Sequence, residues 1–324
     1  MPEPPVRGSG FGVRGSGFGV PAMNLAARAR GVLLAALLVS GAAACRGAAP
    51  ARSDPAAGLP VEAPARIVSL VPAATEMLFA VGAGPQVVGV SSFDAWPPEV
   101  ATRARVGALL DPDVERILAL RPQLVVIYDT QEELRQQLSR AGIASYGFRH
   151  GGLAEVWSTV RDLGRRSGHA PAAGTLARDL AARIEAVSSR VAGRPRPRTL
   201  LVFGRDPAAL RSVYASGGTG FLHEVLDAAG GENVLADVAR ESVAVTTELL
   251  LARAPAHIVE VRPGAPIGPD AAAGLRDAWR VLPAIPAVRD GRISVLVGDE
   301  FVIPGPRLLV AVDRLARALH PDAF

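Results

Sequence analysis

The chain has 324 residues, a length that suits two α/β domains of ordinary size better than one. Its 35 basic residues are all arginine and outnumber the 31 acidic ones, giving a net charge of +4 at neutral pH. Four of these arginines precede Cys45 beside a single glutamate, so the rest of the chain is almost neutral. Without a concentrated basic surface or an aromatic-basic stacking motif, the sequence does not favour nucleic-acid binding.

Residues 1–22 contain VRGSGFG twice in tandem and lack apolar periodicity. We expect a disordered repeat there, or a start site assigned too early, with Met23 as the true start. Residues 23–45 have the layout of a secretory signal: Arg28 and Arg30, a short apolar run, and small residues before Cys45. The apolar run is shorter than the roughly 20 residues that a membrane span needs, so the sequence predicts export.

Cys45 is the single cysteine, which rules out an internal disulfide. Its place after Ala43 and Ala44 resembles the lipobox of bacterial lipoproteins, although Ala42 stands where leucine is usual. We expect lipidation of Cys45 and attachment to the membrane from outside the cytoplasm. The alternative is an ordinary cleaved signal in which Cys45 is incidental. Residues 46–64, rich in Ala, Pro and Gly, predict a flexible tether.

From Arg66 onward, short β-branched runs alternate with amphipathic helical windows, the pattern of an α/β fold with parallel strands. The expected strands are 67–71, 87–90, 124–128, 145–148, 199–203, 257–261 and 293–297. The expected helices are 74–80, 114–120, 132–141, 153–165, 220–229, 248–253, 272–279 and 307–319. Each half of the chain therefore has the elements for its own sheet.

Between the halves, residues 171–191 carry an apolar stripe at helical spacing. The stripe consists of Leu176, Leu180, Ile184, Val187 and Val191. At about 1.5 Å per residue, this helix would be roughly 30 Å long and able to join two lobes. A crossover helix packed on one sheet fits the pattern equally. The first interpretation divides the chain into an N-terminal lobe at 65–168, a connecting helix at 169–194 and a C-terminal lobe at 195–324.

Segments 115–126 and 248–259 repeat one pattern in the same register. Each has a glutamate, Glu115 or Glu248, in the first turn of a short helix, followed by a proline that ends the helix and by a buried strand. For one such glutamate alone, capping or stabilisation of the helix dipole explains its position. Matching carboxylates on two lobes also form a pair of anchors for arginines on a partner with two similar halves.

The segments RIVSLVPAATE at 66–76, VGVSSF at 88–93, PPE at 97–99 and 114–126 resemble the periplasmic binding proteins of cobalamin and ferric-siderophore ABC importers. The resemblance continues through AGGENV at 229–234 and covers residues 66–319. It implies two Rossmann-like lobes with central parallel sheets, joined by one long rigid α-helix. It also implies a monomer that docks through Glu115 and Glu248 on the two permease subunits, which work with separate ATPase subunits.

In this family the ligand lies between the lobes, held by aromatic faces and a few polar groups from strand-end loops. The candidates are Phe93, Trp96, Tyr128, Tyr214, Phe301 and Arg307, each of which also fits ordinary packing. The resemblance favours cobalamin or a related corrinoid, although segments 107–110 and 240–243 lack the tryptophan that cobalamin binders often have there. A ferric siderophore is one alternative and haem is another. For haem, the sequence has no Tyr/His pair at a spacing typical of axial ligands. Cobalt or iron would belong to the transported ligand, and we expect no cofactor of the protein's own.

An exported enzyme is the main rival class. The 5 histidines are scattered and form no HExxH-type motif, and segment 89–93 lacks the final glycine of a nucleophile elbow. The glycine-rich segment 216–220 matches no phosphate-binding motif and predicts a tight turn at the rim of the cleft. We therefore expect no enzyme activity. An exported adhesion or scaffold protein with the same lobes is a third class that composition leaves open.

Overall fold

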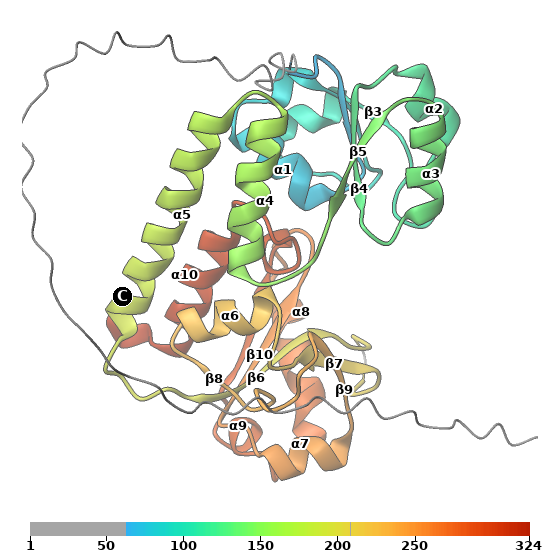
Figure 1. Ribbon diagram of the computed structural model, residues 1–324. Helices are drawn as coiled ribbons and strands as arrows, with labels where there is room; N and C mark the ends of the chain where they lie inside the picture. The colour runs from blue at the N-terminus through green and yellow to red at the C-terminus, as the bar shows by residue number, and fades with distance from the viewer. Residues whose placement is uncertain (1–62, 208) are drawn as a thin grey trace, which may run out of the picture. The chain divides into compact units, whose positions relative to one another are not determined.

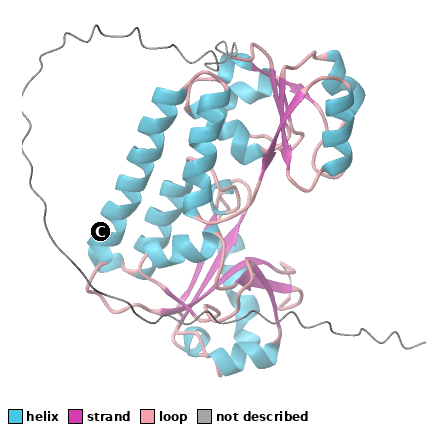
Figure 2. Ribbon diagram, in the orientation of Figure 1, coloured by secondary structure: helices cyan, strands magenta, loops and turns pink. Residues whose placement is uncertain are grey.

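The computed structural model describes residues 63–207 and 209–324. The expectations for the repeat at 1–22, the signal at 23–45 with Cys45, and all but the last two residues of the tether lie outside the described residues. Two β-sheets flanked by helices make up the described chain (Figures 1 and 2). Within these ranges, no helix combines the length and the apolar character needed to cross a membrane.

The first sheet is entirely parallel, with strand order β3-β2-β1-β4-β5. Its strands are β1 (Ile67–Ser69), β2 (Val87–Val90), β3 (Ala104–Arg105), β4 (Leu124–Tyr128) and β5 (Ala144–Phe148). Helices α1 (Pro72–Ala80) and α4 (Leu153–Arg166) cover one face, and α2 (Val114–Ala119) and α3 (Glu132–Arg140) cover the other (Figure 1). Successive strand residues alternate between these faces, as the pleat requires: Val126 packs with the first pair of helices, and Val125 with the second.

The second sheet has strand order β11-β10-β6-β7-β9, with β8 paired to β6. Its strands are β6 (Arg198–Gly204), β7 (Val213–Ser216), β8 (Glu232–Asn233), β9 (Ser242–Val245), β10 (His257–Arg262) and β11 (Ile293–Val297). The expected parallel arrangement holds for β6, β8, β10 and β11, whereas β7 runs antiparallel to both β6 and β9. The loop at 205–212 is too short for a crossover, so β7 folds back beside β6.

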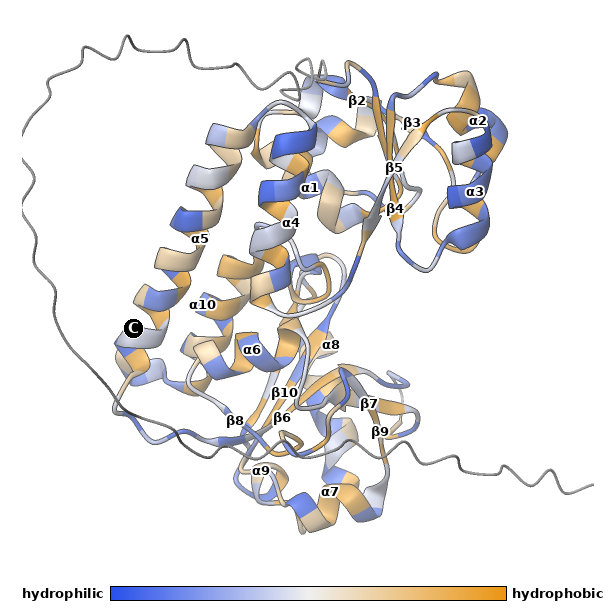
Figure 3. Ribbon diagram, in the orientation of Figure 1, coloured by the Kyte–Doolittle hydropathy of each residue, from blue (hydrophilic) through white to orange (hydrophobic). Residues whose placement is uncertain are grey.

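The helices of the second half are α6 (Phe221–Ala228), α7 (Thr247–Arg253), α8 (Pro269–Asp277), α9 (Pro286–Arg289) and α10 (Leu308–Leu319). As in the first sheet, strand residues alternate between two apolar layers. Leu201 and Val259 pack towards α6 and α10, and Leu200 and Ile258 pack towards Trp279. Figure 3 shows apolar strands at the centre of both sheets, as expected for strands buried on both faces.

The long helix α5 (Ala170–Val191) joins the two sheets and contacts α4 from the first half and α6 and α10 from the second (Figure 1). The predicted stripe is its packing face, with Leu180 and Ile184 buried. A single apolar cluster contains residues of α5 and of both sheets. The connector interpretation is therefore confirmed over the crossover alternative. The same shared core makes the described chain one compact unit, so the lobe boundaries at 65–168 and 195–324 remain an interpretation.

Candidate ligand-binding site and docking surface

The two repeated segments form matching helix–strand units. Glu115 is the second residue of α2, whose N-cap Asp113 accepts a hydrogen bond from the Arg116 amide at 2.9 Å. Glu248 is the second residue of α7, whose N-cap Thr246 accepts one from the Leu249 amide at 3.3 Å. At both helices the N-cap residue is Asp113 or Thr246, so neither glutamate is itself the N-cap, and stabilisation of the helix dipole is still an alternative explanation for both glutamates.

Both helices end in the same way, at a residue with left-handed backbone before a proline. Arg121 has a φ of 47° and Ala254 a φ of 42°. The strands that follow, β4 and β10, occupy equivalent places in the two sheets, each between two parallel neighbours. The internal repeat seen in the sequence is therefore also a structural repeat.

Glu115 and Glu248 are exposed, and neither belongs to an ion pair within the described ranges. The backbone amide and the Thr246 hydroxyl hold the pKa of Glu248 below its usual range, so its carboxylate is charged at neutral pH. Two exposed carboxylates at repeated positions, neither of them in an ion pair within the described ranges, suit contact with cations of another molecule.

Arg307, which precedes α10 directly, lies between Trp96 and Glu76. Its Nε lies 3.1 Å from both carboxylate oxygens of Glu76, and its Nη2 lies 2.5 Å from Oε1. Its guanidinium carbon is 5.4 Å from the centre of the Trp96 ring. Glu76 belongs to α1, so this ion pair connects the two halves of the chain. Burial raises the pKa of Glu76 above its usual range, and Arg307 offsets part of that rise.

Asp94 lies in the loop between β2 and β3, two residues before Trp96, and only 4% of its surface is exposed. Neither carboxyl oxygen takes part in a hydrogen bond within the described ranges. The nearby Thr75 hydroxyl is engaged with Ser69 and Val71. Burial raises the pKa of Asp94 to about 7, against the weaker effects of Thr75, Ser91 and Arg105.

Tyr128, at the end of β4, belongs to an aromatic cluster with Phe148 and His150. The Tyr128 and His150 rings are stacked, with centroids 5.7 Å apart and an interplanar angle of 20°. Phe148 meets both rings edge-on. Burial raises the pKa of Tyr128, and the charge of Asp94 adds to the rise. The fold thus brings together a tyrosine and a histidine that the sequence spacing did not connect.

The remaining candidates differ in what they offer a ligand. Phe93, in the same loop as Trp96, is 75% exposed, and Trp96 is 46% exposed. Tyr214, on β7, is 44% exposed. Phe301 is only 1% exposed, and the Arg314 guanidinium lies 5.0 Å from its ring centre. The prediction that Phe301 contacts the ligand is therefore corrected: its ring packs into the apolar core instead.

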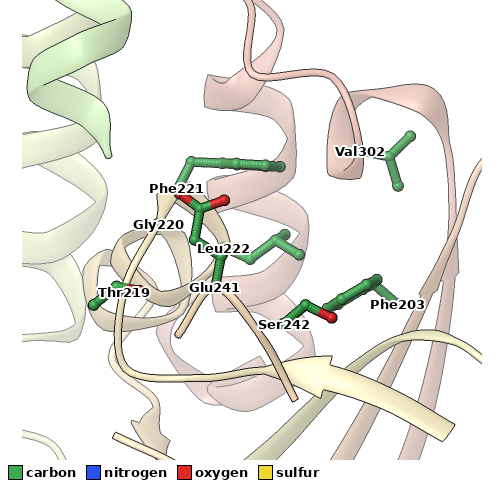
Figure 4. A pocket seen from close by; sticks show the side chains of 8 residues that line it. All are labelled: Phe203, Thr219, Gly220, Phe221, Leu222, Glu241, Ser242 and Val302. Atoms are coloured by element: carbon green, nitrogen blue, oxygen red, sulfur yellow. The ribbon is translucent and has the colours of Figure 1, made fainter. Parts of the chain in front are cut away.

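A pocket of about 250 Å³ lies at the carboxyl end of β6 (Figure 4). Its lining is mainly apolar, with one carboxylate and two hydroxyl groups: Phe203, Thr219, Gly220, Phe221, Leu222, Glu241, Ser242 and Val302. None of the six predicted ligand residues lines it. Small-molecule sites usually measure roughly 300 to 1,000 Å³, so this pocket accommodates only part of a bulky ligand.

Two features of the sequence lie at this pocket, the end of a predicted strand and the glycine-rich turn. Phe203 closes a predicted strand, at the end where parallel α/β sheets bind ligands. The glycine-rich turn was expected at the rim of the cleft, and Thr219 and Gly220 do line the pocket. Gly220 has a φ of 83°, a left-handed backbone that favours glycine, directly before α6. No local sequence pattern marks Asp94 or Glu76 as a site residue, because their roles depend on burial and on partners distant in the sequence.

Within residues 63–207 and 209–324, no group of three or more His, Cys, Asp or Glu side chains is arranged to hold a metal ion. The pocket and the exposed candidates Phe93, Trp96 and Tyr214 offer aromatic and apolar surfaces with a few polar groups. Such a lining suits the binding of a largely apolar molecule with polar substituents.

Residues 67–298 match the model of the periplasmic binding protein family, and the chain belongs to this family. It is thus a substrate-binding component of the ABC-transporter class, acting outside the cytoplasm on a small-molecule ligand that passes to a permease. The fold class predicted from the sequence is confirmed.

Among its relatives, the vitamin B12-binding protein of Salmonella choleraesuis is 32% identical over 256 residues, covering 78% of this chain and 90% of the relative. The ABC transporter substrate-binding lipoprotein YvrC of Bacillus subtilis is 28% identical over 273 residues, covering 81% and 82%.

Solved structures share the fold. The periplasmic vitamin B12 binding protein BtuF of Vibrio cholerae has a TM-score of 0.67 and 24% identity, covering 80% of this chain and 97% of that one. A periplasmic heme binding protein of Pseudomonas aeruginosa has a TM-score of 0.69 and 25% identity, covering 81% and 94%. The fold is thus shared by proteins with different ligands.

Proposed function

We propose that this protein captures cobalamin or a related corrinoid between its lobes and delivers it to an ABC permease without changing it chemically. The observation that carries the proposal is the similarity to vitamin B12-binding relatives, which spans both lobes and 90% of the relative's length. The exposed rings of Phe93, Trp96 and Tyr214 supply aromatic faces of the kind that a large macrocycle needs.

Delivery follows from the two repeated helices. Glu115 and Glu248 each meet an arginine of one permease subunit, so that two similar lobes dock on two similar subunits. ATP hydrolysis in separate subunits then drives release of the ligand. A lipid on Cys45 keeps the binding protein at the membrane. The protein works as a monomer and needs no cofactor of its own.

Haem is a second candidate ligand, favoured by one observation. Tyrosine and histidine are both axial ligands of haem iron in proteins, and Tyr128 and His150 stack at the end of the first sheet. A ferric siderophore has no comparable observation in its favour.

Calorimetric titration of residues 46–324 with cyanocobalamin, hemin and a ferric siderophore tests the ligand assignment. We expect saturable binding of cyanocobalamin, one molecule per chain. Saturation by hemin alone would replace the corrinoid by the second candidate. Turnover of any ligand would contradict the transport role.

The docking assignment is tested by the double variant Glu115→Ala/Glu248→Ala. Each lost charge-assisted contact should cost about 1.5 to 3 kcal/mol of permease association, whereas cyanocobalamin affinity should stay within about twofold of the wild-type value. Measurements of complex formation with the permease in detergent and of uptake into vesicles distinguish these effects.

Glu133→Ala is the matched control for docking, because Glu133 is also an exposed first-turn glutamate, in α3. It should leave permease association and uptake unchanged. Unaltered uptake in the double variant would contradict the anchor assignment.

A further inference from the structure

Arg307 is the guanidinium closest to an exposed aromatic candidate, yet the protein itself occupies much of its binding capacity. Its Nε and Nη2 both bond to Glu76, whose side chain is only 3% exposed. The partners lie 231 positions apart in the sequence, Glu76 before the connecting helix α5 and Arg307 after it. A paired, forked contact of this kind holds both groups in one geometry.

A second carboxylate adds to the neutralisation of this arginine. Glu300 Oε2 lies 3.9 Å from Nη1 of Arg307, and its Oε1 bonds to Arg314 at 2.5 Å. The two arginines therefore share the cluster with two glutamates, and Asp299 and Asp94 lie near enough to act on Glu76 electrostatically or to be acted on by it. The surroundings of Trp96 are thus not electropositive, although they contain a guanidinium.

The consequence for a ligand depends on the charge of its polar arms. A free carboxylate approaching Arg307 meets Glu76 and Glu300 as like charges and must compete with Glu76 for the guanidinium. An uncharged carboxamide needs no such exchange. Its carbonyl can accept from Nη1, for which no hydrogen bond to a described residue exists, while the ion pair with Glu76 stays intact.

We propose that Glu76 is a specificity-determining residue that holds Arg307 in an ion pair between the lobes and thereby selects ligands with uncharged carboxamide arms over ligands with free carboxylates. The inference rests on the proposed function, because it assumes that the ligand lies against Trp96. It assigns the site to the amide-bearing macrocycles and disfavours macrocycles with propionate arms, such as haem.

The test uses two probes that differ in one group: cyanocobalamin, and its monocarboxylic acid derivatives in which one peripheral propionamide has been hydrolysed. By calorimetry, the wild-type protein should bind the acid derivatives at least about tenfold more weakly than cyanocobalamin. In Glu76→Gln, which frees Arg307 and keeps the side-chain shape, this ratio should shrink to about threefold or less.

Glu300→Gln is the matched control, since it removes a carboxylate of the same cluster but leaves the three hydrogen bonds between Arg307 and Glu76. Its ratio should stay closer to the wild-type ratio. Thermal unfolding of each variant checks that it is folded. If Glu76→Gln does not fold, the wild-type comparison decides alone: equal or tighter binding of the acid derivatives would overturn the proposal. So would an unchanged ratio in a folded Glu76→Gln.

Hemin and its dimethyl ester separate a wrong specificity from a wrong ligand. If the wild-type protein binds porphyrins but no corrinoid, the proposed ligand fails, and the role of Glu76 survives only if the ester binds more tightly than the diacid. Tighter binding of the diacid would overturn it. Binding of no probe at all would overturn the proposed function and, with it, this inference.

Discussion

Two buried acidic side chains, one in each half of the molecule, differ in how many hydrogen-bond donors surround the carboxyl group. Glu260, on β10, is 1% exposed and receives hydrogen bonds from Arg205 at 2.8 Å, Arg262 at 2.6 Å and Trp279 at 3.2 Å. Asp94, in the loop after β2, is 4% exposed; its backbone carbonyl accepts from Arg105 at 2.6 Å, but neither oxygen of its carboxyl group has a hydrogen-bond partner within the described ranges. Partners inside the protein neutralise the Glu260 carboxylate, whereas burial without such partners raises the pKa of Asp94 to about 7.

The Glu260 cluster holds the fold together, whereas Asp94 is a group whose charge changes with pH. Arg205 also donates to the backbone carbonyls of Asp206, Pro207 and Leu275, so it fixes the turn between β6 and β7 as well as Glu260. Asp94 lies in the loop that carries Phe93 and Trp96, and with a pKa of about 7 its carboxyl group changes charge near neutral pH. We therefore expect rigidity at the second sheet and pH sensitivity beside the candidate ligand surface.

Removing Arg205, a partner of the buried Glu260 carboxylate, should have the largest effect on stability. Arg205→Met leaves Glu260 buried with one partner fewer and leaves several loop carbonyls without a donor, which should cost about 3 to 5 kcal/mol of unfolding free energy. Guanidinium chloride denaturation measures the loss. Arg211→Met is the control: Arg211 pairs with Asp206 at the surface, so its loss should cost at most about 1 kcal/mol. Equal effects of the two substitutions would contradict the comparison.

Removing the Asp94 carboxyl group should change the pH dependence of stability. Because the pKa of Asp94 is about 7 in the folded protein and about 3.9 in the unfolded chain, the folded state holds the proton between these values. The wild-type protein should therefore lose up to about 4 kcal/mol from this group as the pH rises from 4 to 7, with no further loss above.

Asp94→Asn should remove that contribution, so its stability advantage over the wild-type protein should grow between pH 4 and pH 7 and then stay constant. Denaturation midpoints at a series of pH values measure it. Asp111→Asn, at an exposed aspartate, should follow the wild-type profile. Parallel profiles for Asp94→Asn and the wild-type protein would show that Asp94 is not protonated in the folded state.

A third carboxylate, Glu224 of α6, has a hydrogen-bond partner, but that partner is a backbone amide of the N-terminal half. Its Oε2 accepts a hydrogen bond from the Leu153 amide at 2.7 Å, at the first turn of α4. A Cβ on Gly152 would clash with this carboxylate. An alanine there would displace the flexible carboxylate and break its bond to the Leu153 amide, so Gly152→Ala should cost about 0.5 to 1.5 kcal/mol, and much less in a Glu224→Ala background.

Thermal or chemical unfolding of the two single variants and the double variant measures this coupling. Gly274→Ala is the matched control, since Gly274 lies within α8 with open space at its Cβ position and should tolerate alanine. Additive effects of Gly152→Ala and Glu224→Ala would mean that the two residues do not interact.

Much of the fold was predictable because its signals are local. The β-branched runs at 124–128 and 257–261 and the stripe on α5 mark buried strands and a packed helix without reference to distant residues. The expected strands did not include the two-residue strands β3 and β8, nor did they include β7 and β9. The latter two are four-residue strands whose antiparallel pairing depends on how the chain turns after β6, and Ser216 and Ser242 weaken the strand pattern at their ends.

The site was less predictable, since its properties arise from long-range packing. Glu115 and Glu248 were found through an internal repeat, which is a sequence-level signal. The Glu76–Arg307 pair, the isolation of Asp94 and the stacking of Tyr128 on His150 each depend on segments that meet only in the folded chain. Phe301 shows the converse error: an aromatic residue near a predicted binding loop serves as core.

The central claim, capture of an intact corrinoid, is tested most directly by recovering the bound ligand. Residues 46–324 are saturated with cyanocobalamin, freed of excess ligand by gel filtration and denatured, and the released ligand is quantified and identified by its absorbance and mass. The account predicts one cyanocobalamin per chain, chemically unchanged. A modified corrinoid, or protein that emerges without ligand, would contradict it.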